Sequence, residues 1–327
     1  MLAYQRLILA ALILTLGVVV LGAYVRLSDA GLGCPDWPGC YGKLTPHHAS
    51  EMIGQAQVEQ PGGPVTPAKA WKEMVHRYFA GALGLLVLAI AVQAWRLRRD
   101  SRGGPGLPLA LLALIVFQAL LGMWTVTLLL KPMVVTAHLL GGMATLSLLL
   151  WLWLRERDQF GHAYYARADH LHRIAWLGLV LVILQIALGG WVSTNYAALA
   201  CTDYPLCQGV WVPEMDFEHS FTLHRELGET ASGDFLPMEA LTAIHWVHRM
   251  MALIVFATLA WLVTRLFRTP GYTGMAVLIG ALLLMQFSLG VSNVLFSLPI
   301  AVAVAHNAGA ALLLGSLVLL NFRIRRR

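Results

Sequence analysis

The run Leu7–Val25, LILAALILTLGVVVLGAYV, contains no charged residue from one end to the other. A helix of this length can cross the hydrocarbon core of a bilayer, and backbone polar groups have no water to bond inside lipid, so the run must be helical. Arg6 precedes it, as in a secretory signal peptide, but the run is longer than the apolar part of a typical signal. We therefore interpret it as the first of several membrane-spanning helices.

The composition of the whole chain agrees with this interpretation. Of its 327 residues, 58% are hydrophobic and only 12% are charged, and the mean hydropathy is +0.68. Soluble domains carry about 25% charged residues, so these values exclude a soluble globular protein, a disordered chain and a small disulfide-rich domain. The sequence predicts an all-α integral membrane protein with eight transmembrane helices. We place them at 5–26, 72–95, 107–129, 132–154, 173–194, 238–264, 272–295 and 298–321.

The basic residues gather on one side of these spans. The termini and the connections after the second, fourth and sixth spans hold fifteen of the 23 Lys and Arg, but four of the 17 Asp and Glu. By the positive-inside rule, both termini face the cytoplasm and the long loops at about 27–71 and 195–237 face the opposite compartment. The net charge of +6 is therefore a topology signal, and we expect contact with the lipid bilayer and no nucleic-acid partner.

Three sequence elements occur twice, in the same order. Cys34, Asp36, Pro38, Cys40 and Gly42 recur 167 positions later; Val75-His76-Arg77 matches Val247-His248-Arg249, and Ala137-His138 matches Ala305-His306. This ordered recurrence predicts two tandem pseudo-symmetric four-helix bundles, related by an axis along the membrane normal. We expect the first unit to comprise residues 1–156 and the second to comprise residues 157–327.

Four of the twelve histidines are related by this repeat and lie inside apolar spans. They are His76, His138, His248 and His306, which begin the second, fourth, sixth and eighth spans and so share one depth. Ionisable residues are costly in lipid and mark function, and two imidazoles facing each other across a four-helix bundle suit axial ligation of haem iron. Interhelical hydrogen bonding is the structural alternative. Zinc fits less well, because two imidazoles without a cysteine at that depth leave its coordination incomplete.

Small and charged residues beside these histidines are open to two interpretations. Gly141 and Gly309, three residues after His138 and His306, would make room for a macrocycle, although close helix packing also selects glycine. Arg77 and Arg249 could each pair with a haem propionate, or extend to the lipid headgroups.

The two units differ at the position three residues before the first histidine. Glu73 stands there in the first unit and His245 in the second. Residues at this spacing share a helix face, so Glu73 lies on the His76 side and could transfer protons or orient a substrate. Its structural alternative is an acid favoured by the dipole at a helix N-terminus. His245 receives no assignment from the sequence.

The four cysteines form two closely spaced pairs, one in each long loop. Cys34 and Cys40, and likewise Cys201 and Cys207, are separated by short segments that contain Pro. Because the compartment opposite the cytoplasm is oxidising, we expect the disulfides Cys34–Cys40 and Cys201–Cys207. The spacing is not the usual one for metal ligation, and a redox role beside the histidines stays open as an alternative to stapling.

Taken together, these motifs resemble the haem A synthase family, in its cysteine-containing bacterial type. The resemblance rests on GLGCPDWPGC at 31–40, Glu73-Met-Val-His76-Arg77, Ala137-His138, Val247-His248-Arg249 and Ala305-His306, and covers essentially the whole chain. It implies an enzyme of the bacterial inner membrane that oxidises the C8 methyl group of haem O to a formyl group by successive hydroxylations, with water as the oxygen source.

The resemblance also implies roles for individual residues. His248 and His306, with Arg249, would hold a haem b cofactor, and His76 and His138, with Arg77, would hold the substrate haem O. Glu73 would assist catalysis. Haem O synthase would be the source of substrate, and an unidentified electron acceptor and homo-oligomerisation are left open.

Without the resemblance, the residues support other functions equally. They predict a bis-histidine haem protein with two pseudo-equivalent sites, which also describes a non-catalytic b-type electron carrier. A transporter for haem, built from parallel repeats, is a further alternative. The difference between Glu73 and His245 favours an enzyme, because an electron relay needs no special carboxylate.

Overall fold

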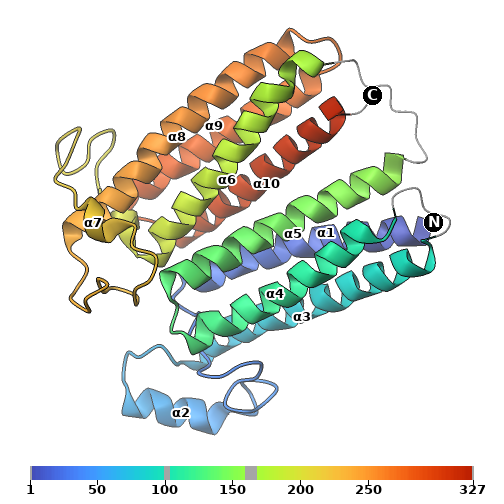
Figure 1. The fold of residues 1–327 in the computed structure, drawn as a ribbon. Coiled ribbons are helices and arrows are strands. Elements are labelled where there is room, and N and C mark those ends of the chain that lie inside the picture. The colour runs from blue at the N-terminus through green and yellow to red at the C-terminus, as the bar shows by residue number, and fades with distance from the viewer. Residues whose placement is uncertain (1, 99–103, 159–167, 326–327) are drawn as a thin grey trace.

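The computed structural model describes residues 2–98, 104–158 and 168–325 (Figure 1). In these ranges the chain is helical and forms no strand, which confirms the predicted fold class. All eight long apolar helices are present, and the chain is a multi-pass membrane protein. They are α1 (Leu2–Leu27), α3 (Pro67–Arg96), α4 (Gly106–Thr127), α5 (Pro132–Asp158), α6 (His172–Thr194), α8 (Met238–Phe267), α9 (Thr273–Leu295) and α10 (Ile300–Arg325).

Two further helices lie in the long loops, where the sequence analysis placed no helix. They are α2 (Ser50–Glu59) and the short α7 (Phe217–Ser220). Both lie at one end of the molecule, which we call the loop end, and both termini lie at the opposite, terminal end (Figure 1). The helix α3 begins several residues earlier than expected, at Pro67, because Thr66 caps it by accepting a hydrogen bond from the Lys69 N–H.

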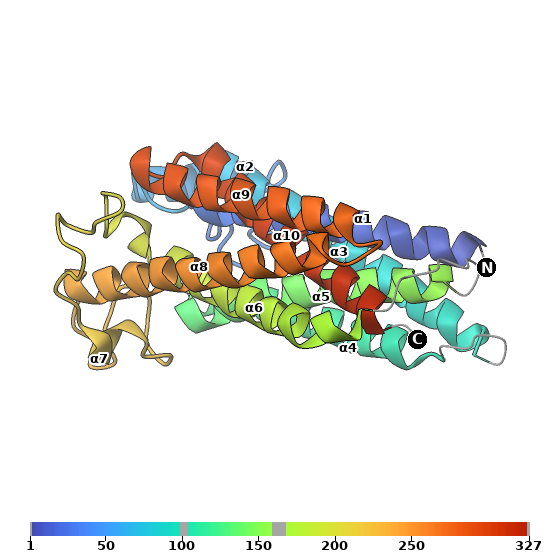
Figure 2. The same ribbon diagram turned by 90° about the horizontal axis from the view of Figure 1, so that it is seen from above.

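The helices pack as two four-membered rings that lie side by side (Figures 1 and 2). In the first, α1 and α4 each contact both α3 and α5, so α3 and α5 stand diagonally opposite. In the second, α6 and α9 each contact both α8 and α10, which are likewise diagonal. The rings meet where α1 and α5 contact α10, and where α5 contacts α6. This packing is consistent with two tandem bundles; a division at residue 156 stays a prediction.

The backbone repeats as the sequence does. Left-handed φ angles, which are uncommon outside glycine, occur at corresponding positions of the two halves. These pairs are Asp29 with Tyr196, Tyr41 with Gln208, Leu129 with Ser297 and Leu130 with Leu298. Such a correspondence shows that the connections have the same local geometry after α1 and α6, and after α4 and α9.

At the junction of the two halves, some residues contact the residue that occupies the equivalent position of the other half. Arg26 Nη2 donates to the Ser193 carbonyl at 2.7 Å, and the Tyr196 hydroxyl donates to Asp29 Oδ1 at 2.8 Å. Both contacts join residues 167 positions apart, which is the spacing of the repeat. The Arg26 guanidinium also lies 4.1 Å from the centre of the Tyr196 ring. Such contacts are consistent with a pseudo-two-fold axis close to these residues.

The aliphatic core fills the terminal half of each ring. One cluster joins Ile8 and Ala11 of α1 to Val87 and Ile90 of α3 and to Leu149 of α5. A second cluster occupies the corresponding part of the other ring and reaches into α5. Lipid tails are as apolar as these side chains, so helix association here depends on close packing. The loop half of each ring, by contrast, contains the intramembrane histidines.

Each long loop begins with a disulfide-closed turn. Cys34 is bonded to Cys40 and Cys201 to Cys207, as predicted. Inside the second turn the Asp203 carboxylate accepts the backbone N–H groups of Gln208 (2.8 Å) and Gly209 (2.9 Å). Gly209 has a φ of +79°, a conformation that glycine adopts without strain. These backbone hydrogen bonds, that of Gly209 first, hold the pKa of Asp203 below its ordinary value.

We expect Asp203→Asn to loosen the second turn at neutral pH. A lowered pKa means that ionised Asp203 stabilises the folded loop above its ordinary pKa of about 3.8. This stabilisation by ionised Asp203 is lost only as the pH falls through the pKa of the group in the folded state, which is lower still. The wild-type turn therefore keeps the full stabilisation at pH 7. Limited proteolysis between residues 195 and 237 should be faster in the variant than in the wild type or in Glu214→Gln. Equal rates would show that the carboxylate does not hold the turn.

Candidate functional site

The two histidines of each unit come from diagonally opposite helices. His76 lies on α3 and His138 on α5, and in the other ring His248 lies on α8 and His306 on α10. The arrangement thus places one pair of histidines, on diagonal helices, in the loop half of each ring. Their role as iron ligands stays a prediction.

Each imidazole lies against a glycine of a neighbouring helix. If these glycines carried a Cβ atom, it would lie between 2.9 and 3.4 Å from the Cε1 atom of the ring. The pairs are Gly22 with His76, Gly122 with His138, Gly189 with His248 and Gly290 with His306. Such distances are tighter than ordinary van der Waals contact, so a larger residue would displace the ring. The glycines therefore set where the imidazoles stand.

Glutamine side chains meet the histidines of α5 and α10. With its amide oriented to satisfy its neighbours, Gln118 of α4 donates to His138 Nδ1 at 2.9 Å and to the His138 carbonyl at 3.1 Å. In the other ring, Gln286 of α9 places its Nε2 atom 3.4 Å from His306 Nε2. Gln118 and Gln286 are 168 positions apart, as are the two histidines. These contacts are an internal repeat that the sequence analysis missed.

The glutamines give Gly141 and Gly309 a different role from the one expected. A Cβ atom on Gly141 would overlap the Gln118 amide, and one on Gly309 would overlap the Gln286 amide. In this structure the space beside these glycines is therefore filled by an amide group. The glycines let the glutamines reach the histidines, which favours the close-packing interpretation, and room for a macrocycle stays a prediction.

Gly309→Ala should destabilise the protein because the new methyl group overlaps the Gln286 amide. Overpacking of this kind costs about 1–3 kcal/mol. The matched control is Gly315→Ala on the same helix, where the added Cβ atom would be at an ordinary 3.6 Å from Leu150. Thermal denaturation in detergent should show a lower midpoint for Gly309→Ala and not for Gly315→Ala. Equal midpoints would mean that Gln286 moves aside without cost.

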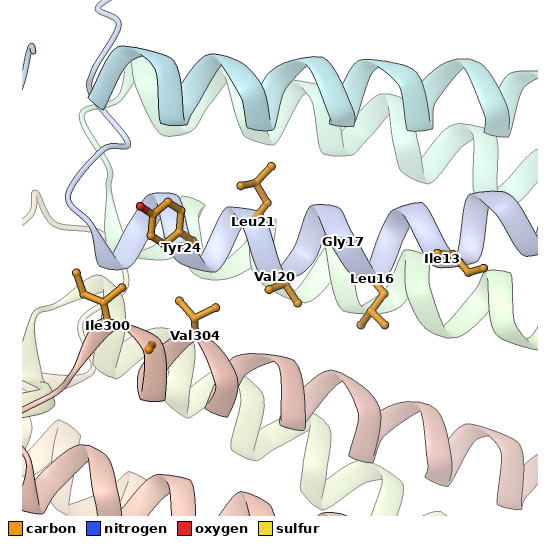
Figure 3. Close-up of a pocket in the computed structure, with 9 residues that line it drawn as sticks. Ile13, Leu16, Gly17, Val20, Leu21, Tyr24, Ile300 and Val304 are labelled. Carbon is orange, nitrogen blue, oxygen red and sulfur yellow. The ribbon is translucent and has the colours of Figure 1, made fainter. Parts of the chain in front are cut away.

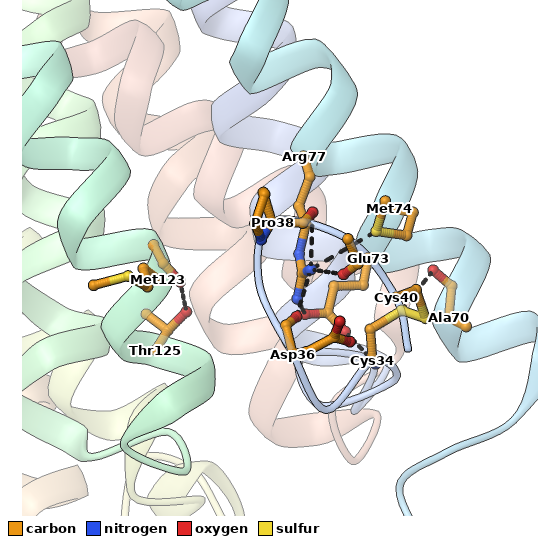
Figure 4. Close-up of polar contacts among 12 residues, drawn as sticks. Cys34, Asp36, Pro38, Cys40, Ala70, Glu73, Met74, Arg77, Met123 and Thr125 are labelled. Atoms are coloured by element: carbon orange, nitrogen blue, oxygen red, sulfur yellow. Dashed lines mark hydrogen bonds and ion pairs between the residues drawn. A yellow bond between two sulfur atoms is a disulfide. The ribbon is translucent and has the colours of Figure 1, made fainter. Parts of the chain in front are cut away.

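Glu73 and Arg77 join α3 to the first disulfide-closed turn (Figure 4). Glu73 is 4% exposed; its Oε2 atom accepts the Cys34 N–H at 2.9 Å, and its Oε1 atom pairs with Arg77 Nη2 at 2.5 Å. Arg77 Nη1 donates to the carbonyls of Asp36 (2.8 Å) and Gly39 (2.5 Å). One buried carboxylate and one guanidinium therefore hold the turn over the helix that carries His76.

The second unit holds its turn with a corresponding set of contacts. The Arg249 guanidinium donates to the carbonyls of Asp203 (3.1 Å), Pro205 (2.9 Å) and Leu206 (2.9 Å). His245 stands in the place of Glu73, and its Nδ1 atom accepts the Cys201 N–H at 3.3 Å. This gives His245 a location that the sequence did not suggest. Both arginines are thus engaged by loop carbonyls, and a contact with a propionate stays a prediction.

The unpaired polar atoms fit a haem ligated by two imidazoles. A neutral imidazole that binds iron through Nε2 keeps its proton on Nδ1 and needs an acceptor for it. Gln185 Oε1 and Gln286 Oε1 are buried beside His248 and His306 and have no hydrogen-bond partner. In the described ranges, no three His, Cys, Asp or Glu side chains come together as a metal site. Two imidazoles at one iron would therefore need a porphyrin to complete the coordination.

A separate cavity lies away from these histidines. It is an apolar groove of about 840 Å³ between α1 and α10, lined by residues that include Leu16, Val20 and Val304 (Figure 3). Tyr24 is the one lining residue with a titratable side chain. None of the four histidines lines this groove.

Comparison with known proteins agrees with this arrangement. Residues 5–318 match the model of the COX15-CtaA family, described as cytochrome oxidase assembly protein. The chain belongs to this family. It is 46% identical to a protein of Shewanella oneidensis named heme A synthase, over 95% of this chain and 93% of the relative. Proteins of the same name from Mesorhizobium japonicum (28% identical; 93% of this chain, 85% of the relative) and Alkalihalophilus pseudofirmus (25%; 99% of each) are also similar.

Membership of the cytochrome oxidase assembly family confirms the resemblance that was inferred from the loop and histidine motifs. The roles of individual residues are not tested by it. A search for further matches at the repeat spacing would have found Gln118 and Gln286, because they recur with the histidines. The glutamine opposite His248, Gln185, has no such match and is visible only in the folded chain.

Proposed function

We propose that this chain is a haem A synthase that oxidises the C8 methyl group of haem O to a formyl group. The oxidation proceeds by successive hydroxylations, with water as the oxygen source. The observation that carries the proposal is a pair of diagonally placed histidines in each of two similar rings, in a chain 46% identical to a protein named heme A synthase. One ring would bind a resident cofactor and the other the substrate.

The second ring is the proposed cofactor site. His248 and His306 would hold haem b, and both have a glutamine amide beside the ring. When bound, this haem supplies one-electron redox chemistry. The surrounding residues position the imidazoles, because Gly189 and Gly290 pack closely against the two rings.

The first ring is the proposed substrate site, with His76 and His138 as the groups that meet haem O. Its distinguishing feature is the Glu73 carboxylate one turn of helix from His76, where the second ring has His245. Each hydroxylation by water releases two electrons and two protons. A carboxylate at this place can accept a proton from the attacking water at Oε1 or Oε2. Those two atoms also bond Arg77 and Cys34, so proton acceptance is coupled to the position of the first turn.

Location and partners follow from the charge asymmetry and from the disulfides. We place the protein in the bacterial inner membrane, with both termini cytoplasmic and the loop end periplasmic, because the basic residues gather at the terminal end. The two disulfides at the loop end suit an oxidising compartment. Haem O synthase would supply the substrate, and a separate electron acceptor would remove the electrons.

Pigment analysis tests the function directly. Cells that express haem O synthase alone accumulate haem O, and co-expression of this chain should convert it to haem A, as measured by extraction and mass spectrometry. Unchanged haem O together with a purified low-spin haem protein would instead indicate an electron carrier, which both histidine pairs would also suit. Unchanged haem O with no bound haem would contradict both functions.

A further inference from the structure

The glutamine contacts are not distributed equally over the four histidines. Gln185 of α6 donates through Nε2 to the His248 carbonyl at 3.1 Å, and the same atom lies 3.1 Å from His248 Nδ1. The histidines of α5 and α10 also have a glutamine beside them. His76 has none. The Nδ1 atoms of His76 and His306 are both buried without a hydrogen-bond partner, but only His306 has a glutamine amide beside its ring. His76 is therefore the one of these four imidazoles without a glutamine beside it.

The cause is a single difference between equivalent positions. Gly22 of α1 and Gly189 of α6 make the same contact, each against the first histidine of its ring, and so fix the register of the two helices. Four residues before Gly189 stands Gln185, and four residues before Gly22 stands Val18. Val18 packs against the aliphatic cluster of the first ring and offers no hydrogen bond. The unequal support thus follows from Val18 and Gln185.

An acceptor beside Nδ1 strengthens a histidine as a metal ligand. It fixes the tautomer that leaves Nε2 free, holds the ring in orientation and makes the imidazole a better electron donor. The Gln185 Nε2 atom is anchored on the His248 carbonyl, and the Oε1 atom of the same amide is buried with no partner. This Oε1 atom is the acceptor that the amide could offer to the Nδ1–H of a ligated His248.

We propose that Gln185 is a positioning residue that makes the haem of the second ring resident, and that Val18 leaves His76 an exchangeable ligand. This inference rests on the proposed function, since it assigns the cofactor to the second ring and the substrate to the first. A substrate that is itself a haem must leave after each reaction, whereas a cofactor must stay. The same pair of imidazoles can serve both needs if one of them is held less firmly in the substrate ring.

Haem transfer to excess apomyoglobin tests the part played by Gln185. We expect Gln185→Val to release the resident haem about 10–100-fold faster than the wild type, the usual loss when such a supporting residue is removed. Gln185→Glu keeps an acceptor and should release slowly. Ser316→Ala is the matched control, because it removes a buried polar group of the second ring that bonds only its own helix. An unchanged rate in Gln185→Val, or an equal acceleration in Ser316→Ala, would overturn the proposal.

The reduction potential separates this role from a purely structural one. Loss of the acceptor weakens electron donation to the iron, so the potential should rise in Gln185→Val and fall below the wild-type value in Gln185→Glu. If Gln185 only held α6 against α8, the two substitutions would not shift the reduction potential in opposite directions. If Gln185→Val does not fold, the reduction potential and the haem release rate of Gln185→Glu still test the proposal. A wild-type reduction potential in Gln185→Glu would contradict it.

The reverse exchange tests Val18. In cells that also make haem O, Val18→Gln should purify with a second haem retained at His76, while the wild type keeps one haem per chain. Pyridine haemochrome analysis against protein concentration measures this ratio. An unchanged ratio would overturn the inference for the first ring. If wild-type extracts contain no haem A, the proposed function fails. The rates of haem release from the second ring still test the role of Gln185 in that case.

Discussion

Replacing His248 or His306 with alanine should abolish the low-spin bis-imidazole spectrum of the purified protein. The two side chains lie on diagonally opposite helices of the second ring, and the described ranges contain no group of three or more His, Cys, Asp or Glu that could hold a metal ion instead. Absorption and electron paramagnetic resonance spectra of the purified variants measure the effect. We expect loss of the haem, or its conversion to a high-spin form with one axial ligand.

The control for this prediction is His224→Ala, which alters an exposed loop histidine. It should keep the wild-type spectrum. The same substitution at His76 or His138 should leave the resident haem in place and remove the conversion of haem O. Retention of the low-spin spectrum in both His248→Ala and His306→Ala would show that the resident haem, if present, is bound elsewhere.

Glu73→Gln should stop haem A formation while the resident haem is retained. The amide has nearly the shape of the carboxylate and can still accept the Cys34 N–H, but it cannot take up a proton from water. Loss of a general base typically lowers a rate by about 10²–10⁴-fold. Pigment extraction gives the product, and the absorption spectrum of the purified variant gives the haem content.

Two further measurements separate catalysis from support of the turn. Glu51→Gln, an exposed acid in the same loop, should leave product formation unchanged. Limited proteolysis of residues 27–71 should give the same fragments for Glu73→Gln as for the wild type, because the disulfide and the Arg77 contacts with the turn remain. Normal haem A formation by Glu73→Gln would remove this carboxylate from the mechanism.

The spans and the histidines could be predicted because each is governed by a strong local rule. Lipid requires long uncharged helices, and the eight apolar runs therefore coincide with the eight helices, apart from a few terminal residues. The histidines stood out because a repeat placed costly residues at one depth. The long loops obey no comparable rule, and α2 and α7 were not foreseen in their polar sequences.

The partners of the site residues could not be predicted, because they depend on how the helices pack. A glutamine in an apolar run signals some interhelical contact, but only the fold shows that Gln118 meets His138. In the same way, the contacts of Arg77 with the carbonyl groups of the turn are visible only in the folded chain. The contact of Gly141 could not be predicted because the side chain that fills its space lies on another helix.

The contacts of Arg26 with Ser193, and of Asp29 with Tyr196, have a consequence for the origin of the chain. A residue meets its own counterpart only near the symmetry axis of a dimer built from identical subunits. In such an ancestor every substitution would appear in both halves, so the two rings could not differ. A single chain is free of that constraint. Glutamate can stand in one half and histidine at the equivalent position of the other, so the two halves can take separate tasks.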